Sequence, residues 1–268
     1  MRIMKLLFLV YFVFWSCQEK QSQVENKKEN PPEETGINGK TEAMKPEDTE
    51  IWEPKPPQLT IDENTGIPSD AIVLFNGTDF DQWISSKDSS EVKWILNKDG
   101  SMTVKDKTGD IQTKQNFGSA QIHLEWRSNP EIKGENQSRS NSGVFLQGKY
   151  EIQILDNNDN HTYVNGQVGS IYKQSIPLAN ASKPTGEWNS YDIIYHAPEF
   201  DENNKKIKPG TLTVLHNGVL IQDHVEIKGT TEYIGAPKNR PHGKGPLKLQ
   251  DHGDNSGVSF RSIWLREI

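Results

Sequence analysis

Apolar and polar side chains alternate with a period of two along most of the chain after residue 70. In 121–127, Ile122, Leu124 and Trp126 alternate with polar or charged residues. Successive side chains of a strand point to opposite faces, so this pattern predicts a half-buried β-strand. The same pattern recurs in 149–155, 191–196, 247–252 and 258–265.

Turn signals separate these segments. Asn217-Gly218 lies between the alternating runs 211–216 and 219–223, and Asn-Gly in such a place is a strong signal for a two-residue hairpin. No run of residues shows the helical period over four turns. Many short strands with turns between them indicate a sandwich or barrel, and about 200 residues suffice for one sizeable core. The sequence therefore predicts an all-β jelly-roll sandwich of two antiparallel sheets over 69–268.

Residues 1–16 have the composition of an export signal. Arg2 and Lys5 precede an apolar run of ten residues that ends at Trp15. This run is too short to span a bilayer core of about 30 Å, but it suits a signal peptide. The arrangement resembles bacterial lipoprotein signals, in which Cys17 would become the lipidated N-terminal residue, although Trp15 is bulkier than the residue expected there. The alternative is a free or buried cysteine in an exported protein.

Residues 17–68 predict a disordered tether. Seven of the fifteen prolines fall in this segment, which is rich in Glu, Lys and Asn and poor in large apolar residues. Such a segment cannot bury enough surface to offset its ordering entropy. Cys17 is the only cysteine, so no intrachain disulfide is expected. A lipid on Cys17 would anchor the protein to the bacterial cell envelope, and the adjacent Gln18 suits the outer membrane.

The charge balance argues against nucleic acid as a partner. The chain has 30 basic and 37 acidic side chains, a net charge of −7. Loss of Arg2 and Lys5 with the signal would make the remaining chain still more acidic. Nucleic-acid binding relies on basic side chains that neutralise phosphates, and no run of basic residues interleaved with aromatics occurs here.

One sheet of a jelly roll can curve, and its outer face then forms a groove. Polar residues that alternate outward from that sheet would line the groove. Residues that are distant in the sequence are therefore expected to lie close together in this groove. They are Glu125, Glu151, Gln153, Gln250 and His252.

Three stretches, 139–156, 186–193 and 246–253, follow Leu74-Phe-Asn-Gly-Thr-Asp-Phe-Asp-Gln-Trp83 in a specific order and spacing. With it they resemble the 3-keto-disaccharide hydrolase domain family over Ala71 to Ile268. The resemblance implies a concanavalin A-like jelly roll that acts on glycosides whose sugar is oxidised at C3. Family members are similar to enzymes that split such 3-keto-glycosides by hydrolysis, or by elimination followed by hydration.

The chemistry of such a substrate defines the groups that the site needs. A ketone at C3 acidifies the hydrogen on C2, so a base can remove it and the enolate can expel the C1 substituent. The enolate oxygen needs stabilisation and the leaving group needs an acid. A divalent metal ion could stabilise the enolate. No nucleotide cofactor is expected, because the oxidation precedes this reaction.

We predict Glu151, Gln153 and His252 as the catalytic residues. Glu151 and Gln153 lie two apart on one strand and so point into the same groove. His252 follows Gln250 on one face of another strand, and a histidine can act as base, acid or metal ligand. Glu151 and His252 are the candidate metal ligands. The alternatives are that Glu151 pairs with a cross-strand Arg or Lys and that His252 bonds a loop carbonyl.

Six further polar residues are candidate substrate-binding groups because they lie near these segments in sequence or share the expected face. Their side chains could hold sugar hydroxyls or a keto oxygen, or could stabilise turns instead. They are Glu125, Arg139, Asn141, Asp156, Lys173 and Gln250.

Two other functions use the same groove. Glu151 to Asp156 resembles the Glu-Ile-Asp-x-x-Glu signature of jelly-roll β-glucanases, but Gln153 replaces its middle acid. Retaining hydrolysis needs carboxyl groups about 5–5.5 Å apart, whereas residues five apart on a regular strand are separated by roughly 17 Å. A lectin-like module without chemistry is the second alternative, although such a module would favour exposed aromatic residues over a polar set.

Overall fold

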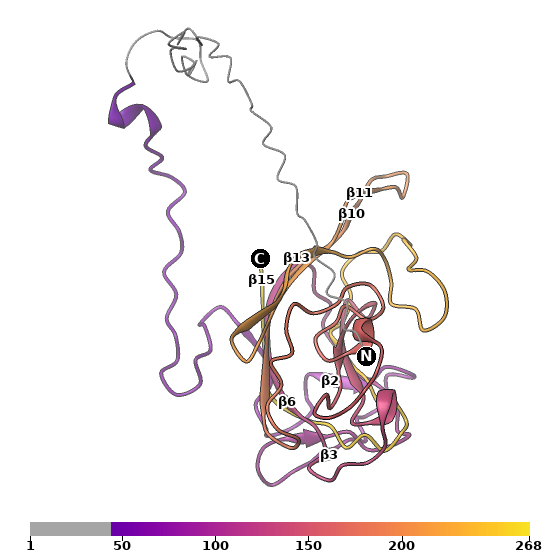
Figure 1. Ribbon diagram of the computed structural model, residues 1–268. Coiled ribbons are helices and arrows are strands. Elements are labelled where there is room, and N and C mark those ends of the chain that lie inside the picture. Colours follow the sequence, from indigo (N-terminus) through magenta and orange to yellow (C-terminus); the bar gives the residue numbers. More distant parts are fainter. Residues whose placement is uncertain (1–43) are drawn as a thin grey trace, which may run out of the picture. The chain divides into compact units, whose positions relative to one another are not determined.

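The computed structural model describes residues 44–268 (Figure 1). The predicted signal peptide and Cys17 lie outside these residues. The described chain divides at Pro56 into a short unit and a compact unit that begins at Pro57. The short unit holds the 3-10 helix η1 (Pro46–Thr49). No helix within 44–268 has the length and hydrophobicity needed to cross a membrane.

The compact unit is built around an eight-stranded antiparallel sheet. Its order is β13-β12-β9-β6-β15-β4-β3, and β1 pairs with β15 as well. The strands are β1 (Ile72–Phe75), β3 (Ile95–Leu96), β4 (Met102–Thr103), β6 (Ala120–Arg127), β9 (Asn189–His196), β12 (Thr211–His216), β13 (Val219–Glu226) and β15 (Ser259–Glu267).

A five-stranded antiparallel sheet of order β2-β5-β14-β7-β8 forms the second layer. Its strands are β2 (Trp83–Ser85), β5 (Ile111–Thr113), β7 (Ser142–Leu146), β8 (Tyr150–Ile154) and β14 (Lys248–Leu249). The hairpin β10 (Glu199–Phe200) and β11 (Lys206–Lys208) and the 3-10 helices η2 (Asn136–Ser138) and η3 (Val164–Gly166) complete the described elements.

The core lies between the inner faces of the two sheets. Burial along β6 alternates without a break, and Ile122, Leu124 and Trp126 are its buried members. From the five-stranded sheet, Val144 and Ile152 are fully buried within the same cluster. Two antiparallel sheets that bury alternate residues against each other form a β-sandwich. The structure therefore confirms the predicted all-β jelly roll.

A β-bulge in β15 changes which residues face the core. The pairing with β6 shifts between Arg261 and Trp264, and Ser262 has a left-handed φ of 51°. A bulge adds one residue to a strand and so exchanges the faces beyond it. Phe260 and Ile263 are consequently both buried, although strict alternation predicts opposite faces for them.

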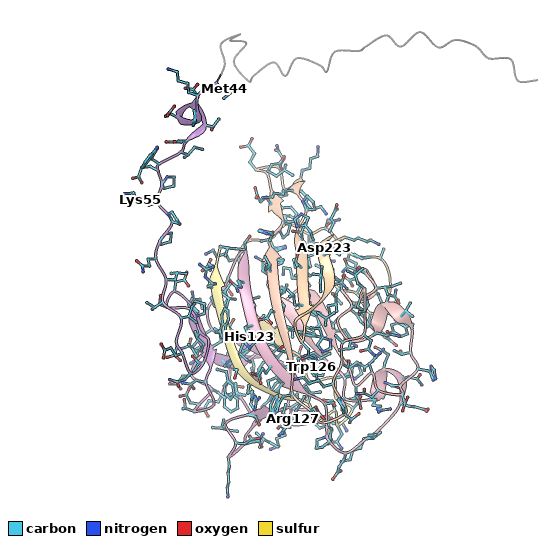
Figure 2. All side chains as sticks on the ribbon, turned by 60° about the vertical axis from the view of Figure 1, so that its left-hand side comes forward. Met44, Lys55, His123, Trp126, Arg127 and Asp223 are labelled. Carbon is cyan, nitrogen blue, oxygen red and sulfur yellow. The ribbon has the colours of Figure 1, made fainter. Side chains whose placement is uncertain are left out.

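The outer face of the eight-stranded sheet carries polar side chains that pair across strands. On β6, His123 and Arg127 alternate with the inward Trp126 (Figure 2). The Nδ1 atom of His123 lies 2.7 Å from Asp192 Oδ1 on β9. Cross-strand pairs of this kind contribute to the stability of the sheet.

The edge of the five-stranded sheet at β8 is covered by chain segments from elsewhere. The amide of Gln153 donates to the Ser170 carbonyl at 3.0 Å, and the amide of Tyr172 donates to the Glu151 carbonyl at 3.1 Å. The Glu151 amide donates to Thr231 Oγ1 at 3.0 Å. These bonds satisfy groups that an edge strand would leave open, and they bring two loops beside Glu151.

Candidate functional site

A polar cavity of 270 Å³ opens on the outer face of the five-stranded sheet. Its volume is just below the range of about 300–1,000 Å³ that is common for small-molecule sites. The lining residues come from β7, β8 and four loops, and they are Asn141, Phe145, Glu151, Gln153, Tyr172, Thr231, Tyr233, Gln250 and His252.

Strand register places the central residues of the cavity beside one another. Glu151 lies opposite Phe145 and Gln153 opposite Gly143 in the β7–β8 pairing. Lys248 of β14 lies opposite Phe145 on the other side of β7. Directly opposed residues project from the same face of a sheet, so these side chains share the outer face.

Gly143 creates the space that the Glu151 carboxyl group occupies. A Cβ atom at position 143 would lie 2.5 Å from Glu151 Oε1 and 2.9 Å from Phe145 Cε2. Glycine is needed here because the carboxyl group and the Phe145 ring converge over this backbone.

Replacement Gly143→Ala is expected to lower kcat about 100-fold. The added methyl would displace the Glu151 carboxyl group, and a misplacement of about 1 Å can cost that much in rate. Steady-state kinetics on the substrate proposed below measures the effect. Gly243→Ala is the matched control, because a Cβ there would meet no atom within 4 Å. Equal rates for Gly143→Ala and the wild type would contradict this role.

Glu151 is a buried carboxyl group, with only 4% of its surface exposed. Burial disfavours the ionised form and raises the pKa of Glu151 to about 8, while the Lys248 ammonium group lowers it and the Asp110 carboxylate raises it. Glu151 therefore holds a proton more tightly than an ordinary carboxyl group, and its carboxylate is a stronger base.

The Gln153 amide is the neighbour of this carboxyl group. Its orientation with the nitrogen toward Glu151 gives a 3.1 Å contact to Oε1, with a second contact of 3.3 Å to the Ser142 carbonyl. In the opposite orientation the amide oxygen of Gln153 would face Glu151. A protonated Glu151 carboxyl group could then donate a hydrogen bond to that oxygen. The amide can therefore serve either protonation state of Glu151.

Gln250, Asp251 and His252 follow β14 and have different environments. Gln250 Oε1 is buried and accepts no hydrogen bond from the described residues. His252 lines the cavity, and its Nδ1 lies 3.0 Å from Asp254 Oδ2. Asp251 accepts hydrogen bonds from the Thr108 and Gly109 amides and so holds a neighbouring loop.

A charged pair beside the cavity was not predicted from the sequence. Lys248 Nζ lies 2.7 Å from Asp110 Oδ2 and 4.0 Å from the centre of the Phe145 ring. Lys248 lies two residues before Gln250, so alternation along a strand puts both on one face. This spacing is the only sequence signal that could have identified Lys248 as a neighbour of the site. Phe145, Tyr172, Thr231 and Tyr233 also line the cavity but were not among the predicted site residues.

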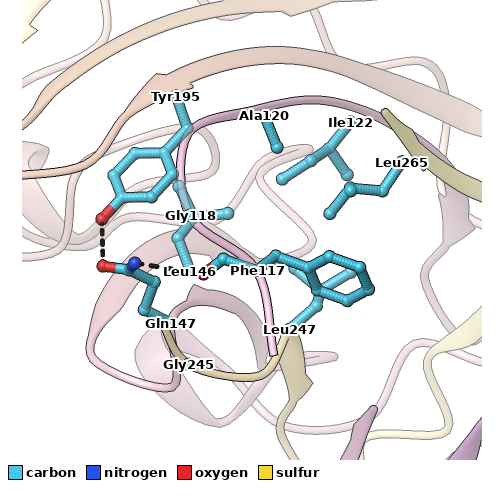
Figure 3. Close-up of a pocket in the computed structure, with 10 residues that line it drawn as sticks. All are labelled: Phe117, Gly118, Ala120, Ile122, Leu146, Gln147, Tyr195, Gly245, Leu247 and Leu265. Carbon is cyan, nitrogen blue, oxygen red and sulfur yellow. Dashed lines mark hydrogen bonds between the residues drawn. The ribbon is translucent and has the colours of Figure 1, made fainter. Parts of the chain in front are cut away.

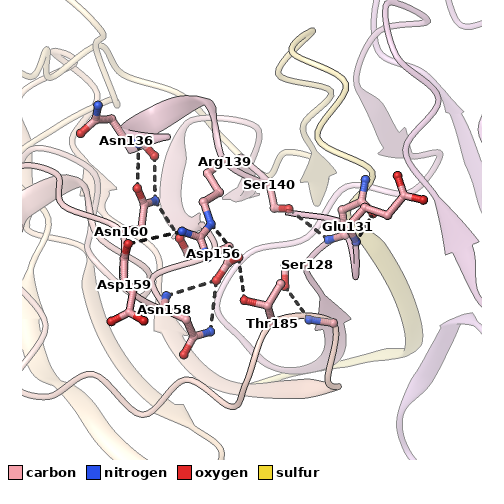
Figure 4. Close-up of polar contacts among 12 residues, drawn as sticks. Ser128, Glu131, Asn136, Arg139, Ser140, Asp156, Asn158, Asp159, Asn160 and Thr185 are labelled. Atoms are coloured by element: carbon pink, nitrogen blue, oxygen red, sulfur yellow. Dashed lines mark hydrogen bonds and ion pairs between the residues drawn. The ribbon is translucent and has the colours of Figure 1, made fainter. Parts of the chain in front are cut away.

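Arg139 and Asp156 form a buried ion pair and do not line the cavity (Figure 4). Arg139 Nε donates to Asp156 Oδ2 at 2.9 Å, and Thr185 Oγ1 donates to the same oxygen at 2.9 Å. Arg139 and Asp156 were predicted as substrate-binding residues, but the structure engages both side chains in this internal pairing, outside the cavity lining. Their substrate-binding role stays a prediction. Asp156 also lies beyond the end of β8 at Ile154.

Glu125 and Lys173 also lie outside the cavity lining. Glu125 is on β6 of the other sheet, where it accepts a hydrogen bond from Arg261. The expectation that it neighbours Glu151 is wrong, since the period of two does not tell which sheet a strand joins. Lys173 is exposed, and its Nζ donates to the Tyr233 carbonyl at 2.7 Å.

Glu151 and His252 are the two residues of the cavity lining that were predicted as metal ligands. No cluster of three or more His, Cys, Asp and Glu side chains suited to a metal occurs among residues 44–268. The other polar groups of the lining are neutral amides and hydroxyl groups. The role of Glu151 and His252 as metal ligands stays a prediction, and no step below depends on it.

Two other hollows lie in the compact unit. One is apolar, has a volume of 10 Å³ and lies against the Tyr195–Gln147 hydrogen bond (Figure 3). It is about the size of a single water probe and cannot hold a substrate. The other, of 200 Å³, lies beside β2 and β5 and is lined by residues such as Lys93 and Glu91, without an aromatic side chain.

Comparison with known proteins places the chain in a family. A crystal structure of a Parabacteroides distasonis protein provisionally named a glycosyl hydrolase is 53% identical, with a TM-score of 0.79, over 84% of this chain and 97% of that one. A second protein of that organism, with the same provisional name, is 22% identical, with a TM-score of 0.55, over 74% of this chain and 94% of that one. None of the curated proteins matches this chain.

The sequence model of one domain family matches residues 70–266, which is nearly the whole compact unit. This match confirms the resemblance inferred from the motifs in 74–83, 139–156, 186–193 and 246–253. Together with the 53% identical relative, it shows that the chain belongs to the family of 3-keto-alpha-glucoside-1,2-lyase-like domains.

Proposed function

We propose that the protein cleaves 3-keto-glycosides by β-elimination followed by hydration, with Glu151 as the general base. The observation that carries the proposal is the buried Glu151 carboxyl group beside a small polar cavity, with its pKa raised to about 8. A base works best when its pKa lies near the working pH. The family membership and the provisional glycosyl hydrolase names of the relatives support the choice of a sugar substrate.

Cleavage of a substrate with a C3 ketone begins at the acidic hydrogen on C2. The Glu151 carboxylate takes the proton from C2, and the C–H electron pair forms an enolate across C2 and C3. The enolate then re-forms the ketone and a C1=C2 double bond, while the bond from C1 to the leaving oxygen breaks. Water adds to C1, and Glu151 returns its proton to C2. The sum is hydrolysis to a 3-keto sugar and an alcohol.

The other polar residues of the cavity have supporting roles. His252, held by Asp254, gives a proton to the leaving oxygen and recovers one from water. The buried side-chain oxygen of Gln250 has no hydrogen-bond partner among the described residues. A sugar hydroxyl can therefore donate a hydrogen bond to this oxygen. The Gln153 and Asn141 amides line the same wall and can hold the remaining ring oxygens.

The test is activity on a 3-keto-glucoside set against the same glucoside with its C3 hydroxyl intact. We expect cleavage of the keto form only, because the hydroxyl form has no acidic C2 hydrogen. His252→Ala should lower kcat about 10²–10⁴-fold, the usual range for a lost acid or base. A substrate with a good leaving group, such as 4-nitrophenol, should restore part of that rate.

Three outcomes separate the alternatives. Cleavage of the unoxidised glucoside at an equal rate would indicate a conventional glycosidase. Binding of both sugars without cleavage would indicate a lectin-like module. Full activity of His252→Ala would remove His252 from the mechanism.

A further inference from the structure

An exposed aromatic ring, that of Tyr233, stands at the polar cavity. Tyr233 lines the cavity, yet 73% of its surface is exposed. It belongs to the long connection between β13 and β14, residues 227–247. Loops of this length without regular structure are uncommon and are often functional.

Several contacts fix the position of this ring. The Thr230 amide donates to the Lys238 carbonyl at 2.9 Å, which closes the base of the loop. Thr231 is tied to β8 through its bond from the Glu151 amide. Lys173 Nζ lies 4.6 Å from the centre of the Tyr233 ring and also donates to the Tyr233 carbonyl. Tyr233 is therefore a positioned ring and not a loose side chain at a loop tip.

Two more tyrosines extend this aromatic surface. The Tyr163 and Tyr172 hydroxyl groups lie 2.6 Å apart. Lys173 Nζ lies 5.5 Å and 5.4 Å from the centres of these two rings. One ammonium group thus contacts three aromatic rings, and only Tyr172 is buried among the three.

The cavity is small and opens to solvent at its mouth, where Tyr233 lies. Its 270 Å³ is just below the range for ordinary ligand sites, so one sugar ring can occupy it beside Glu151. The second part of any glycoside must then lie at the mouth. An exposed tyrosine offers a flat apolar surface with a polar end, which suits the apolar face of a six-membered ring.

We propose that Tyr233, held by Lys173, is the binding surface for the leaving part of the substrate, and that this part is a six-membered ring. Tyr233 would then make the site favour a 3-keto-glycoside with a second ring at C1 over one with a small alkyl group. This inference rests on the proposed function for the identity of the first ring.

The test compares dissociation constants of phenyl, glucosyl and methyl 3-keto-glucosides. Binding is measured by calorimetry on the full chain carrying Glu151→Gln, which cannot turn the ligands over. We expect the ring-bearing ligands to bind about tenfold more tightly than the methyl glucoside, in line with truncation costs above 1 kcal/mol at good contacts. Adding Tyr233→Ala should bring this ratio close to one, while Tyr233→Trp should keep it.

Two matched variants locate the effect. Ile234→Ala changes the equally exposed neighbour, which does not line the cavity, and should leave the ratio unchanged. Lys93→Ala changes the polar hollow beside β2 and should leave it unchanged as well. The proposal would be overturned if the wild-type site showed no preference for ring-bearing ligands. It would also be overturned if Tyr233→Ala kept the ratio of dissociation constants, or if Lys93→Ala lost it.

The outcomes also separate this subsite from the proposed chemistry. A preference that depends on Tyr233 in a protein whose wild type does not cleave 3-keto-glucosides would keep the subsite and reject the reaction. Cleavage of 3-keto-glucosides without a preference for ring-bearing ligands would keep the reaction and reject the subsite. A gain for the glucosyl ligand alone would identify the second ring as a sugar, and a gain for the phenyl ligand alone would identify it as aryl.

Discussion

Glu151→Gln is expected to lower kcat for cleavage of a 3-keto-glucoside by about 10²–10⁴-fold. The amide keeps the shape of the carboxyl group but cannot accept the C2 proton, and a lost general base costs about 10²–10⁴ in rate. In the wild type, kcat/KM should rise with pH toward the Glu151 pKa of about 8, because only the carboxylate is the base. Initial rates from pH 5 to 10 measure both effects.

The same substitution is expected to stabilise the fold at neutral pH. Between the ordinary pKa of 4.5 and about 8, native Glu151 keeps a proton that the unfolded chain has released. Wild-type stability therefore falls as pH rises through this window. At pH 7 the loss is about 3 kcal/mol, at 1.36 kcal/mol per pKa unit, and Glu151→Gln should recover it. Urea unfolding at pH 4.5 and pH 7 measures the difference.

Glu125→Gln is the control for both measurements, because Glu125 is a carboxyl group on the other sheet. It should leave turnover unchanged. If Glu151→Gln were as active as the wild type, the base would have to be another residue. The stability gain is the unfolding free energy of Glu151→Gln minus that of the wild type. If this gain were the same at pH 7 and pH 4.5, the Glu151 pKa would not be raised.

Arg139→Met is expected to destabilise the protein by about 3–5 kcal/mol. The substitution leaves the Asp156 carboxylate buried without its cation, and removal of one partner of a buried ion pair costs about this much. Asp156 is 2% exposed, so water cannot replace the guanidinium group. Thermal or urea unfolding of the purified variant measures the loss.

Lys208→Met is the matched control, since Lys208 forms an exposed ion pair with Glu199 at 3.0 Å. Pairs of this kind contribute about 0–1 kcal/mol. A double variant, Arg139→Met with Asp156→Leu, should recover part of the lost stability because both buried charges are gone. If Arg139→Met is as stable as the wild type but fails to bind substrate, the internal pairing would not be its role.

Much of the fold follows from local patterns. The alternation in β6 and β8 assigns Leu124 and Ile152 to the core and Glu151 to the opposite face, because a strand has only two sides. The same rule fails in β15, where the bulge at Ser262 exchanges the faces of the residues that follow. Ser262 carries no strong turn signal, and the backbone adopts the bulge because β6 pairs on both sides of it.

The sequence by itself determined the class of fold and the family, and its period of two placed Glu151 and Gln153 on one face of β8. Only the tertiary structure decided which sheet each strand joins. It therefore separated Glu125 from the cavity and drew Arg139 and Asp156 into a buried pair. It also brought the distant Lys248 and Tyr233 beside Glu151, because strand pairing and loop closure are contacts between residues far apart in the chain, and local periodicity carries no information about them.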